Sequence, residues 1–136
     1  MSIKGADIRN IAVIGHSGEG KTSVVEAILF NGGTTDRLGK VTDGNTVTDY
    51  DEQEIARKMS ISLSMAYTMW DGVKLNLLDV PGFYDFEGEE NEALRAAGGA
   101  LIVTGATGTL TVGAEKAIDK CLKNKIPMVV FINGVD

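Results

Sequence analysis

The sequence has one cysteine among 136 residues, no long apolar run and an excess of acidic over basic side chains. The lone Cys121 excludes an internal disulfide bond and is typical of a reducing compartment. The segment from Met1 to Asp7 has no apolar core of signal-peptide length, and no later run reaches membrane-spanning length. The formal net charge of −6 disfavours a broad nucleic-acid-binding surface. We therefore expect one cytoplasmic domain with no direct nucleic-acid or membrane contact.

Short apolar segments alternate with helical patterns, which predicts an α/β fold with a mostly parallel sheet. Predicted strands cover Ile8 to Ile14, a segment ending at Asp79, Ala100 to Val103, and Pro127 to Ile132. Helices are expected from about Gly20 to Asn31, from about Glu87 to Gly98, and around residues 114–122. In the last of these, a stripe at helical spacing comprises Ala114, Ala117, Ile118, Cys121 and Leu122, so Cys121 is interpreted as a small core residue.

Residues 60–69 alternate strictly, with Ile61, Leu63, Met65, Tyr67 and Met69 on one face. This pattern predicts a strand with one solvated face at the edge of the sheet. Asp71-Gly72 then predicts a hairpin turn, so the next strand should pair antiparallel to the first. The preceding polar segment, residues 34–59, shows little periodicity and is expected to be a long, poorly ordered loop that is either functional or a plain insertion.

The stretch Gly15-His16-Ser17-Gly18-Glu19-Gly20-Lys21-Thr22 fits G-x-x-x-x-G-K-[ST] and lies between a predicted strand and a predicted helix. Glycines in such a loop let consecutive N–H groups converge on an anion, which also meets the positive end of the helix. We expect Lys21 to reach the β- and γ-phosphates of a nucleotide, and the Thr22 hydroxyl to hold Mg²⁺. The loop through Ser23 is therefore a predicted phosphate site. The alternative is a glycine-rich turn without a ligand.

Two further strand ends carry polar residues. Asp79-Val80-Pro81-Gly82 follows the return strand, where Asp79 could hold the metal ion through water and the Gly82 N–H could approach a γ-phosphate. The same sequence is also favourable for a plain turn. Asn133 and Asp136 follow the last strand, where a carboxylate could accept the N1 and amine hydrogens of guanine. Ligands bind beyond the carboxyl ends of parallel strands, so we expect the three strand ends to share one site.

From Arg9 to Asp136 the chain resembles the amino-terminal part of the GTP-binding domain of elongation factor G, a translational GTPase. The resemblance is carried by Gly20-Lys21-Thr22, the stretch from Asp43 to Glu54, Ser60-Ile61, Asp79-Val80-Pro81-Gly82 and Asn133 with Asp136. It implies the P-loop GTPase fold with three layers, GTP or GDP as ligand, Mg²⁺ as cofactor and the ribosome as partner. It also implies that residues 34–59 form the first switch, that residues 80–88 form the second, and that Ser60 replaces a metal-binding threonine.

Three positions depart from the family pattern. Gly18 stands where the family usually has an aspartate, and Gly134 stands where it has a lysine that packs over the base. Phe83 occupies the catalytic position of the histidine that places the attacking water, and a phenyl ring cannot hydrogen-bond water. Hydrolysis should therefore be slow or should use another group, with Tyr84 as a candidate. These departures indicate a divergent paralogue.

The family's GTP-binding domain continues beyond Asp136, so residues 1–136 are interpreted as part of that domain, either an engineered fragment or a natural truncation. The last apolar strand would then expose an edge through which copies of the chain self-associate. Three functions compete: a GTPase that acts as a switch on the ribosome, a guanine-nucleotide-binding module with little hydrolysis, and a P-loop ATPase or non-nucleotide scaffold. The first is the leading hypothesis.

Overall fold

The computed structural model describes residues 3–82 and 87–135, which form one five-stranded sheet. Its strands are β1 (Ile8–Ile14), β2 (Ser64–Trp70), β3 (Val73–Asp79), β4 (Gly99–Gly105) and β5 (Met128–Asn133). They lie in the order β2-β3-β1-β4-β5. The pairs β1–β3, β1–β4 and β4–β5 are parallel, whereas β2 runs antiparallel to β3 at one edge. The predicted α/β fold with one antiparallel edge strand is confirmed.

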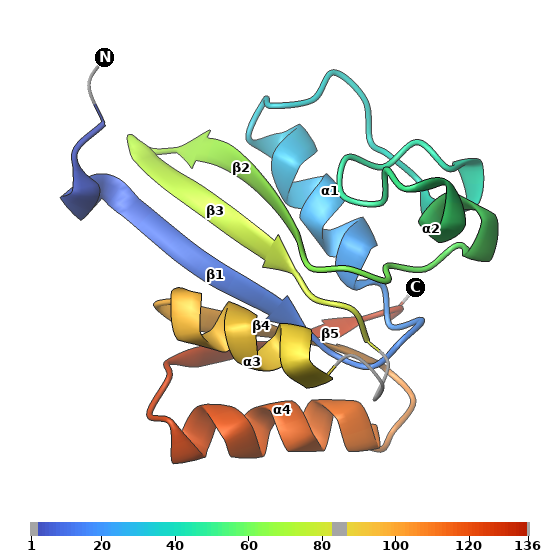
Figure 1. Ribbon diagram of the computed structural model, residues 1–136, viewed down its shortest axis with the longest axis vertical. Coiled ribbons are helices and arrows are strands. Elements are labelled where there is room, and N and C mark those ends of the chain that lie inside the picture. Colours follow the sequence, from blue (N-terminus) through green and yellow to red (C-terminus); the bar gives the residue numbers. More distant parts are fainter. Residues whose placement is uncertain (1–2, 83–86, 136) are drawn as a thin grey trace.

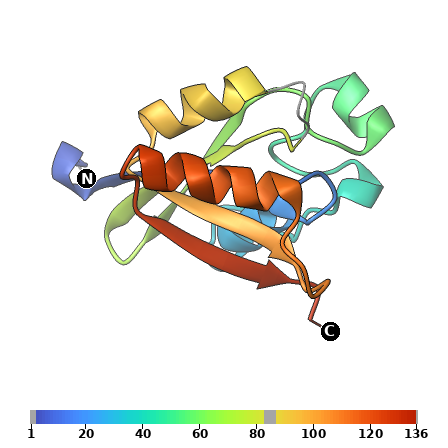
Figure 2. The same cartoon turned by 90° about the horizontal axis from the view of Figure 1, so that it is seen from below.

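Helices cover the two faces of the sheet and give the molecule three layers (Figure 1). Helix α1 (Lys21–Asn31) lies on one face, where Val25 and Leu29 pack against apolar side chains of the sheet. Helices α3 (Glu87–Ala96) and α4 (Val112–Lys123) lie on the other face, and Figure 2 shows them side by side there. Among the described residues, no helix combines the length and the apolar character that crossing a membrane requires.

The predicted buried stripe of α4 is confirmed for most of its length, but its last residue is exposed. Ala114, Ala117 and Cys121 are fully buried, and burial raises the pKa of the Cys121 thiol, as expected for a core residue. Leu122, in contrast, is 61% exposed. Helical spacing tells on which side of a helix a residue lies. How wide a strip of that side becomes buried depends on packing against the sheet, which the sequence does not reveal.

Strand β2 departs from its sequence pattern in extent and in the face it buries. It begins at Ser64 rather than at residue 60, and its small and polar side chains Ser64, Ala66 and Thr68 are the buried ones. The apolar side chains of the opposite face are exposed: Met65, Tyr67 and Met69. The reason is that α1 packs against β2 on the side of Ala66, so small side chains fit beneath the helix.

The hairpin after β2 follows its prediction. Asp71 and Gly72 have φ angles of 48° and 79°, as a tight hairpin turn with two left-handed residues requires. This turn sets the register of β2 on β3, in which Trp70 pairs with Val73 and Ser64 pairs with Asp79. The hairpin therefore brings the beginning of β2 to the carboxyl end of β3.

The segment 34–59 is more structured than the loop expected from its composition. It contains a 3₁₀ turn (Val41–Asp43) and a short helix α2 (Glu52–Arg57). Asp51 caps α2, because its carboxylate accepts the Gln53 N–H at 2.8 Å while the Glu54 carboxylate accepts the Asp51 N–H at 3.3 Å. This capping box stabilises a helix too short to show apolar periodicity.

The segment is also fastened to α1 by a buried carboxylate. Glu26, which is 1% exposed, accepts the Val47 N–H at 2.6 Å. A Cβ atom at position 39 would overlap the same carboxylate, so a larger residue there would displace the Glu26 side chain. The segment 34–59 therefore packs beside α1 and next to the carboxyl ends of the strands (Figure 1).

Candidate functional site

The carboxyl ends of β1, β3 and β5 meet at one edge of the sheet, as the parallel pairing requires. After β1 the chain forms the glycine-rich loop, in which Gly18 and Gly20 have φ angles of 83° and 88°. This left-handed conformation favours glycine, and it turns the chain directly into α1, which begins at Lys21. The loop therefore lies at the N-terminus of a helix, where backbone N–H groups attract anions.

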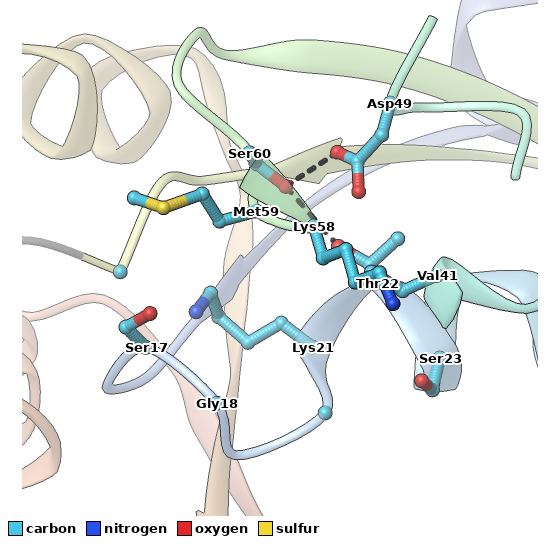
Figure 3. Close-up of a pocket in the computed structure, with 12 residues that line it drawn as sticks. Ser17, Gly18, Lys21, Thr22, Ser23, Val41, Asp49, Lys58, Met59 and Ser60 are labelled. Carbon is cyan, nitrogen blue, oxygen red and sulfur yellow. Dashed lines mark hydrogen bonds between the residues drawn. The ribbon is translucent and has the colours of Figure 1, made fainter. Parts of the chain in front are cut away.

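A cavity of about 210 Å³ opens above this loop. Figure 3 shows that its lining combines the loop with the end of the segment 34–59. The lining residues are Ser17, Gly18, Gly20, Lys21, Thr22, Ser23, Val41, Asp49, Lys58, Met59, Ser60 and Gly82. Six of the predicted phosphate-loop residues therefore share one cavity with the predicted metal residue Ser60.

Lys21 extends across the mouth of the loop. Its ammonium donates a hydrogen bond to the His16 carbonyl oxygen at 3.0 Å, and the side chain is buried. Burial lowers the pKa of Lys21, while the nearby Asp79 carboxylate acts in the opposite direction. A cation that has lost most of its water and whose partner within the described part of the chain is a neutral carbonyl is a strong binding site for an anion.

Thr22 lies at the centre of a hydroxyl and carboxylate cluster. Its hydroxyl donates to Asp79 Oδ2 at 2.8 Å and lies 3.2 Å from the Ser60 hydroxyl oxygen. Ser60 in turn donates to Asp49 Oδ1 at 2.6 Å, and Thr48 donates to Asp79 Oδ2 at 3.0 Å. The structure thus brings together all three residues predicted to hold the metal ion, Thr22, Ser60 and Asp79. Figure 3 shows Thr22 and Ser60 facing each other, with Asp49 beside Ser60.

Two carboxylate oxygens of this cluster, Asp49 Oδ2 and Asp79 Oδ1, are buried and have no hydrogen-bond partner among the described residues. Burial raises the pKa of Asp79 to about 6 and also raises the pKa of Asp49. Unpaired buried carboxylate oxygens beside two hydroxyl groups suit a hard divalent cation, because Mg²⁺ prefers oxygen ligands and keeps several waters. Within the described residues no group of three or more His, Cys, Asp or Glu side chains is placed to hold a metal ion.

Gly82 lies directly against the phosphate loop. Its carbonyl oxygen accepts the Ser17 N–H at 3.1 Å, and a Cβ atom at this position would overlap the Lys21 ammonium and the Ser17 nitrogen. Glycine is therefore required by the close approach of two backbone segments. The predicted contact of the Gly82 N–H with a γ-phosphate stays a prediction.

Asn133 joins the end of β5 to the same loop. Its side-chain amide donates to the Glu19 carbonyl oxygen at 2.9 Å, and a Cβ atom at position 20 would overlap that amide. The remaining predicted residues, Phe83 and Asp136, lie outside the described residues, as does the alternative Tyr84. Among the described residues, the structure thus brings the glycine loop, the Asp79 turn and Asn133 together.

The sequence does not reveal the roles of three residues in the site: Thr48, Asp49 and the side chain of Glu19. Asp49 and Thr48 belong to the polar segment that resembles elongation factor G, but the pattern assigns no role to either residue. Glu19 is a predicted loop residue, but its side chain also braces the loop by accepting the His16 N–H at 2.9 Å and the Thr104 hydroxyl at 3.3 Å. Thr48 and Asp49 place a hydroxyl next to a carboxylate in the same polar segment that leads to Ser60, and this combination could have indicated that both residues contribute to the cluster.

A strand, a glycine-rich loop and a helix that begins with Lys21 and Thr22 define the P-loop class of nucleotide-binding domains. The chain belongs to the family described as the elongation factor Tu GTP binding domain, whose model matches residues 6–136.

Individual relatives agree with this assignment. The chain is 40% identical over 129 residues to an elongation factor G-like protein of Mycobacterium tuberculosis, and the match covers 95% of this chain and 18% of the relative. It is 40% identical over 131 residues to the mitochondrial ribosome-releasing factor 2 of Drosophila willistoni, with 96% and 18% covered. A crystal structure from Thermus thermophilus superposes with a TM-score of 0.87 at 37% identity, covering 94% of this chain and 19% of that one. The chain thus spans about a fifth of the length of these relatives, and the predicted resemblance to elongation factor G-type proteins is confirmed.

Proposed function

We propose that this chain binds GTP and GDP with Mg²⁺ and hydrolyses GTP, as the nucleotide-driven switch of an elongation factor G-like translation factor. The observation that carries the proposal is the meeting of the glycine loop with the Thr22–Asp79–Ser60 cluster at one cavity. A phosphate chain in the loop would lie between the Lys21 ammonium and the cluster. With Mg²⁺ held at the cluster, positive charge would lie on both sides of the phosphoryl group, which is the arrangement that phosphoryl transfer needs.

In the proposed reaction, water attacks the γ-phosphate in line with the bond to the β-phosphate. Lys21 neutralises charge that develops on the β- and γ-phosphate oxygens, and the loop N–H groups hold the phosphate chain in place. Thr22 and Ser60 would hold Mg²⁺ directly and Asp79 would hold it through water. The metal ion would supply Lewis-acid stabilisation of the phosphate oxygens. Gly82 would respond to the γ-phosphate through its N–H.

Base recognition is assigned to Asn133 and Asp136. The Asp136 carboxylate would accept the N1 and amine hydrogens of guanine, a donor pair that adenine does not offer. Asn133 would hold the base side of the site against the phosphate loop, a role supported by its bond to the Glu19 carbonyl oxygen. Gly134 provides no side chain to pack over the base, so affinity should be lower than in relatives that carry lysine there.

Competition between GTP and ATP for a fluorescent guanine nucleotide tests the proposal. The expected result is that GTP displaces the probe at far lower concentrations than ATP, and that Asp136→Asn reduces this preference while the Mg²⁺ requirement persists. Equal displacement by ATP would exclude the guanine assignment and favour a P-loop ATPase. A well-folded sample that binds neither nucleotide would favour the scaffold.

Phe83 supports a second candidate function, a module that binds guanine nucleotide but hydrolyses it slowly. We expect Phe83→His to raise the single-turnover rate of phosphate release by at least about tenfold, because positioned general acid–base groups contribute roughly 10²–10⁴-fold. The measurement is phosphate release with and without ribosomes, and Phe83→Leu is the matched control that restores no hydrogen bond. A wild-type rate that already equals that of Phe83→His would show that another group, such as Tyr84, positions the water.

The setting of this activity is part of the proposal. Residues 1–136 would form part of the GTP-binding domain of a longer cytoplasmic translation factor that reaches the ribosome through its other domains. The segment itself would make no direct nucleic-acid or membrane contact, in keeping with its net charge of −6.

The exposed strand β5 supports one prediction about the chain in isolation. Val129, Val130, Phe131 and Ile132 are between 43% and 65% exposed, and β5 pairs with β4 alone in the described sheet. Apolar edge strands offer unpaired N–H and C=O groups to a second chain. We therefore expect the 136-residue chain to self-associate through β5. Light scattering should show dimers or larger species that Val130→Lys abolishes, and a monomer at high concentration would contradict the prediction.

A further inference from the structure

Three consecutive backbone N–H groups at the start of the β2 segment are bound by carboxylates rather than by a neighbouring strand. Ile61 and Ser62 donate to Glu54 Oε1 at 2.9 and 3.2 Å. Leu63 donates to Glu89 Oε2 at 2.9 Å. Glu54 lies on α2 and Glu89 on α3, so side chains from two helices far apart in the sequence hydrogen-bond the backbone of one short stretch of chain. We call residues 61–63 with these two carboxylates the carboxylate clamp.

The clamp explains why β2 begins at Ser64 although its alternating pattern begins at residue 60. The N–H groups of residues 61–63 are already satisfied, so this stretch has no need of ladder hydrogen bonds with a neighbouring strand. The Glu54 side chain is 2% exposed, and its second oxygen accepts the Asp51 N–H at 3.3 Å. A buried carboxylate is costly unless donors satisfy it, and here three backbone donors do so.

The residue next to the clamp is Ser60. Its hydroxyl donates to Asp49 at 2.6 Å and lies 3.2 Å from the Thr22 hydroxyl, so it faces the metal cluster. The direction of a serine hydroxyl depends on the backbone that carries it. That backbone is held on its C-terminal side by the clamp, and therefore by α2 and α3 together.

We propose that Glu54 and Glu89 are positioning residues, which hold the Ser60 hydroxyl at the metal site and connect the occupancy of that site to α3. This inference rests on the proposed function, since it takes Mg²⁺ and a guanine nucleotide as the ligands. The two carboxylates touch neither ligand and act through the backbone of residues 61–63. Loss of a carboxylate should therefore weaken the binding of the metal ion while leaving the phosphate loop intact.

The two glutamates offer a sharp test, because they use their oxygens differently. Among the described residues Glu89 accepts one N–H, that of Leu63, so Glu89→Gln keeps an acceptor and should behave as wild type, whereas Glu89→Ala should not. Glu54 accepts with both oxygens, so Glu54→Gln should be intermediate and Glu54→Ala most severe. Glu92→Gln, at an exposed position of α3, controls for the loss of charge.

The experiment measures the release rate of a fluorescent, non-hydrolysable GTP analogue from the full 136-residue chain across a Mg²⁺ titration and in EDTA. For Glu54→Ala and Glu89→Ala we expect the Mg²⁺ concentration that half-slows release to rise roughly tenfold, as for other losses of a partner that orients a metal ligand. The release rate in EDTA should stay at the wild-type value. Amide hydrogen exchange at residues 61–63 should be faster in both alanine variants.

Each outcome decides a different point. An unchanged Mg²⁺ midpoint in both alanine variants, or an equal change of the release rate in EDTA, would overturn the clamp as a positioning device. A wild-type chain without Mg²⁺-dependent binding of the GTP analogue would remove the proposed function, and the clamp's role with it. If Glu54→Ala does not fold, as judged by circular dichroism, the Glu89→Ala and Glu89→Gln pair decides.

Discussion

Lys21→Met is expected to weaken the binding of GTP and GDP by roughly 10- to 100-fold, because one hydrogen bond to a charged group is worth about 1.5–3 kcal/mol. The same variant should unfold at no lower temperature than wild type in the absence of nucleotide. The reason is that the Lys21 ammonium is buried, its pKa is lowered by that burial, and its hydrogen-bond partner is a neutral carbonyl at 3.0 Å. Methionine retains the apolar part of the side chain and removes the cost of burying the charge.

Isothermal titration with GDP and a thermal melt in EDTA measure the two effects. Lys123→Met, at an exposed position of α4, is the matched control and should leave the affinity unchanged. A loss of affinity together with a lower melting temperature would mean that Lys21 supports the fold. An unchanged affinity would mean that the cavity above the loop does not hold the phosphates.

Asp79→Asn is expected to stabilise the chain in EDTA near pH 8 and to remove its response to Mg²⁺. Burial raises the pKa of Asp79 from 3.8 to about 6, so the folded chain binds this proton more tightly than the unfolded chain does. The stability that the protonated carboxyl contributes is therefore complete below pH 3.8 and is lost as the pH rises through about 6. At about 1.4 kcal/mol per pKa unit, the difference at pH 8 is on the order of 3 kcal/mol.

Asparagine keeps an oxygen that can accept from Thr22 and Thr48, so the substitution removes the buried charge with little loss of hydrogen bonding. Melting temperatures between pH 4 and pH 8 in EDTA should show an advantage for Asp79→Asn that vanishes at the acidic end. With Mg²⁺ and GDP the order should reverse, because the ligands stabilise wild type more strongly. A variant that is less stable than wild type at every pH would contradict the buried-charge argument.

The sequence was most informative where local chemistry allows one solution. The strand from Ile8 to Ile14, the glycine-rich loop and the hairpin at Asp71-Gly72 each depend on neighbouring residues alone, and the structure has them at the predicted positions. Parallel pairing then places the strand ends on one edge, so Lys21, Asp79 and Asn133 could be assigned to one site before any coordinates.

Other features depend on contacts between distant segments, which no local pattern encodes. The face of β2 that becomes buried depends on where α1 lies, and the exposed Met65 and Tyr67 therefore contradict their alternation. Helix α2 is held by one capping box and by the bonds of the buried Glu54 carboxylate, not by an apolar stripe. Asp49 joins the metal cluster because Ser60, eleven residues later, returns to meet it.

The contact between Asn133 and the phosphate loop divides the site into two halves, and ligands should differ in which half they contact. The loop and the end of β5 touch so closely that position 20 has no room for a side chain, so they form one fixed half of the site. Ser60 donates to Asp49 and precedes residues 61–63, which Glu54 of α2 and Glu89 of α3 hold, so these two residues form a second half that depends on both helices. Nucleoside diphosphates should therefore draw their affinity from the fixed half, and any compound that spans the cavity to Ser60 should be sensitive to the state of α3.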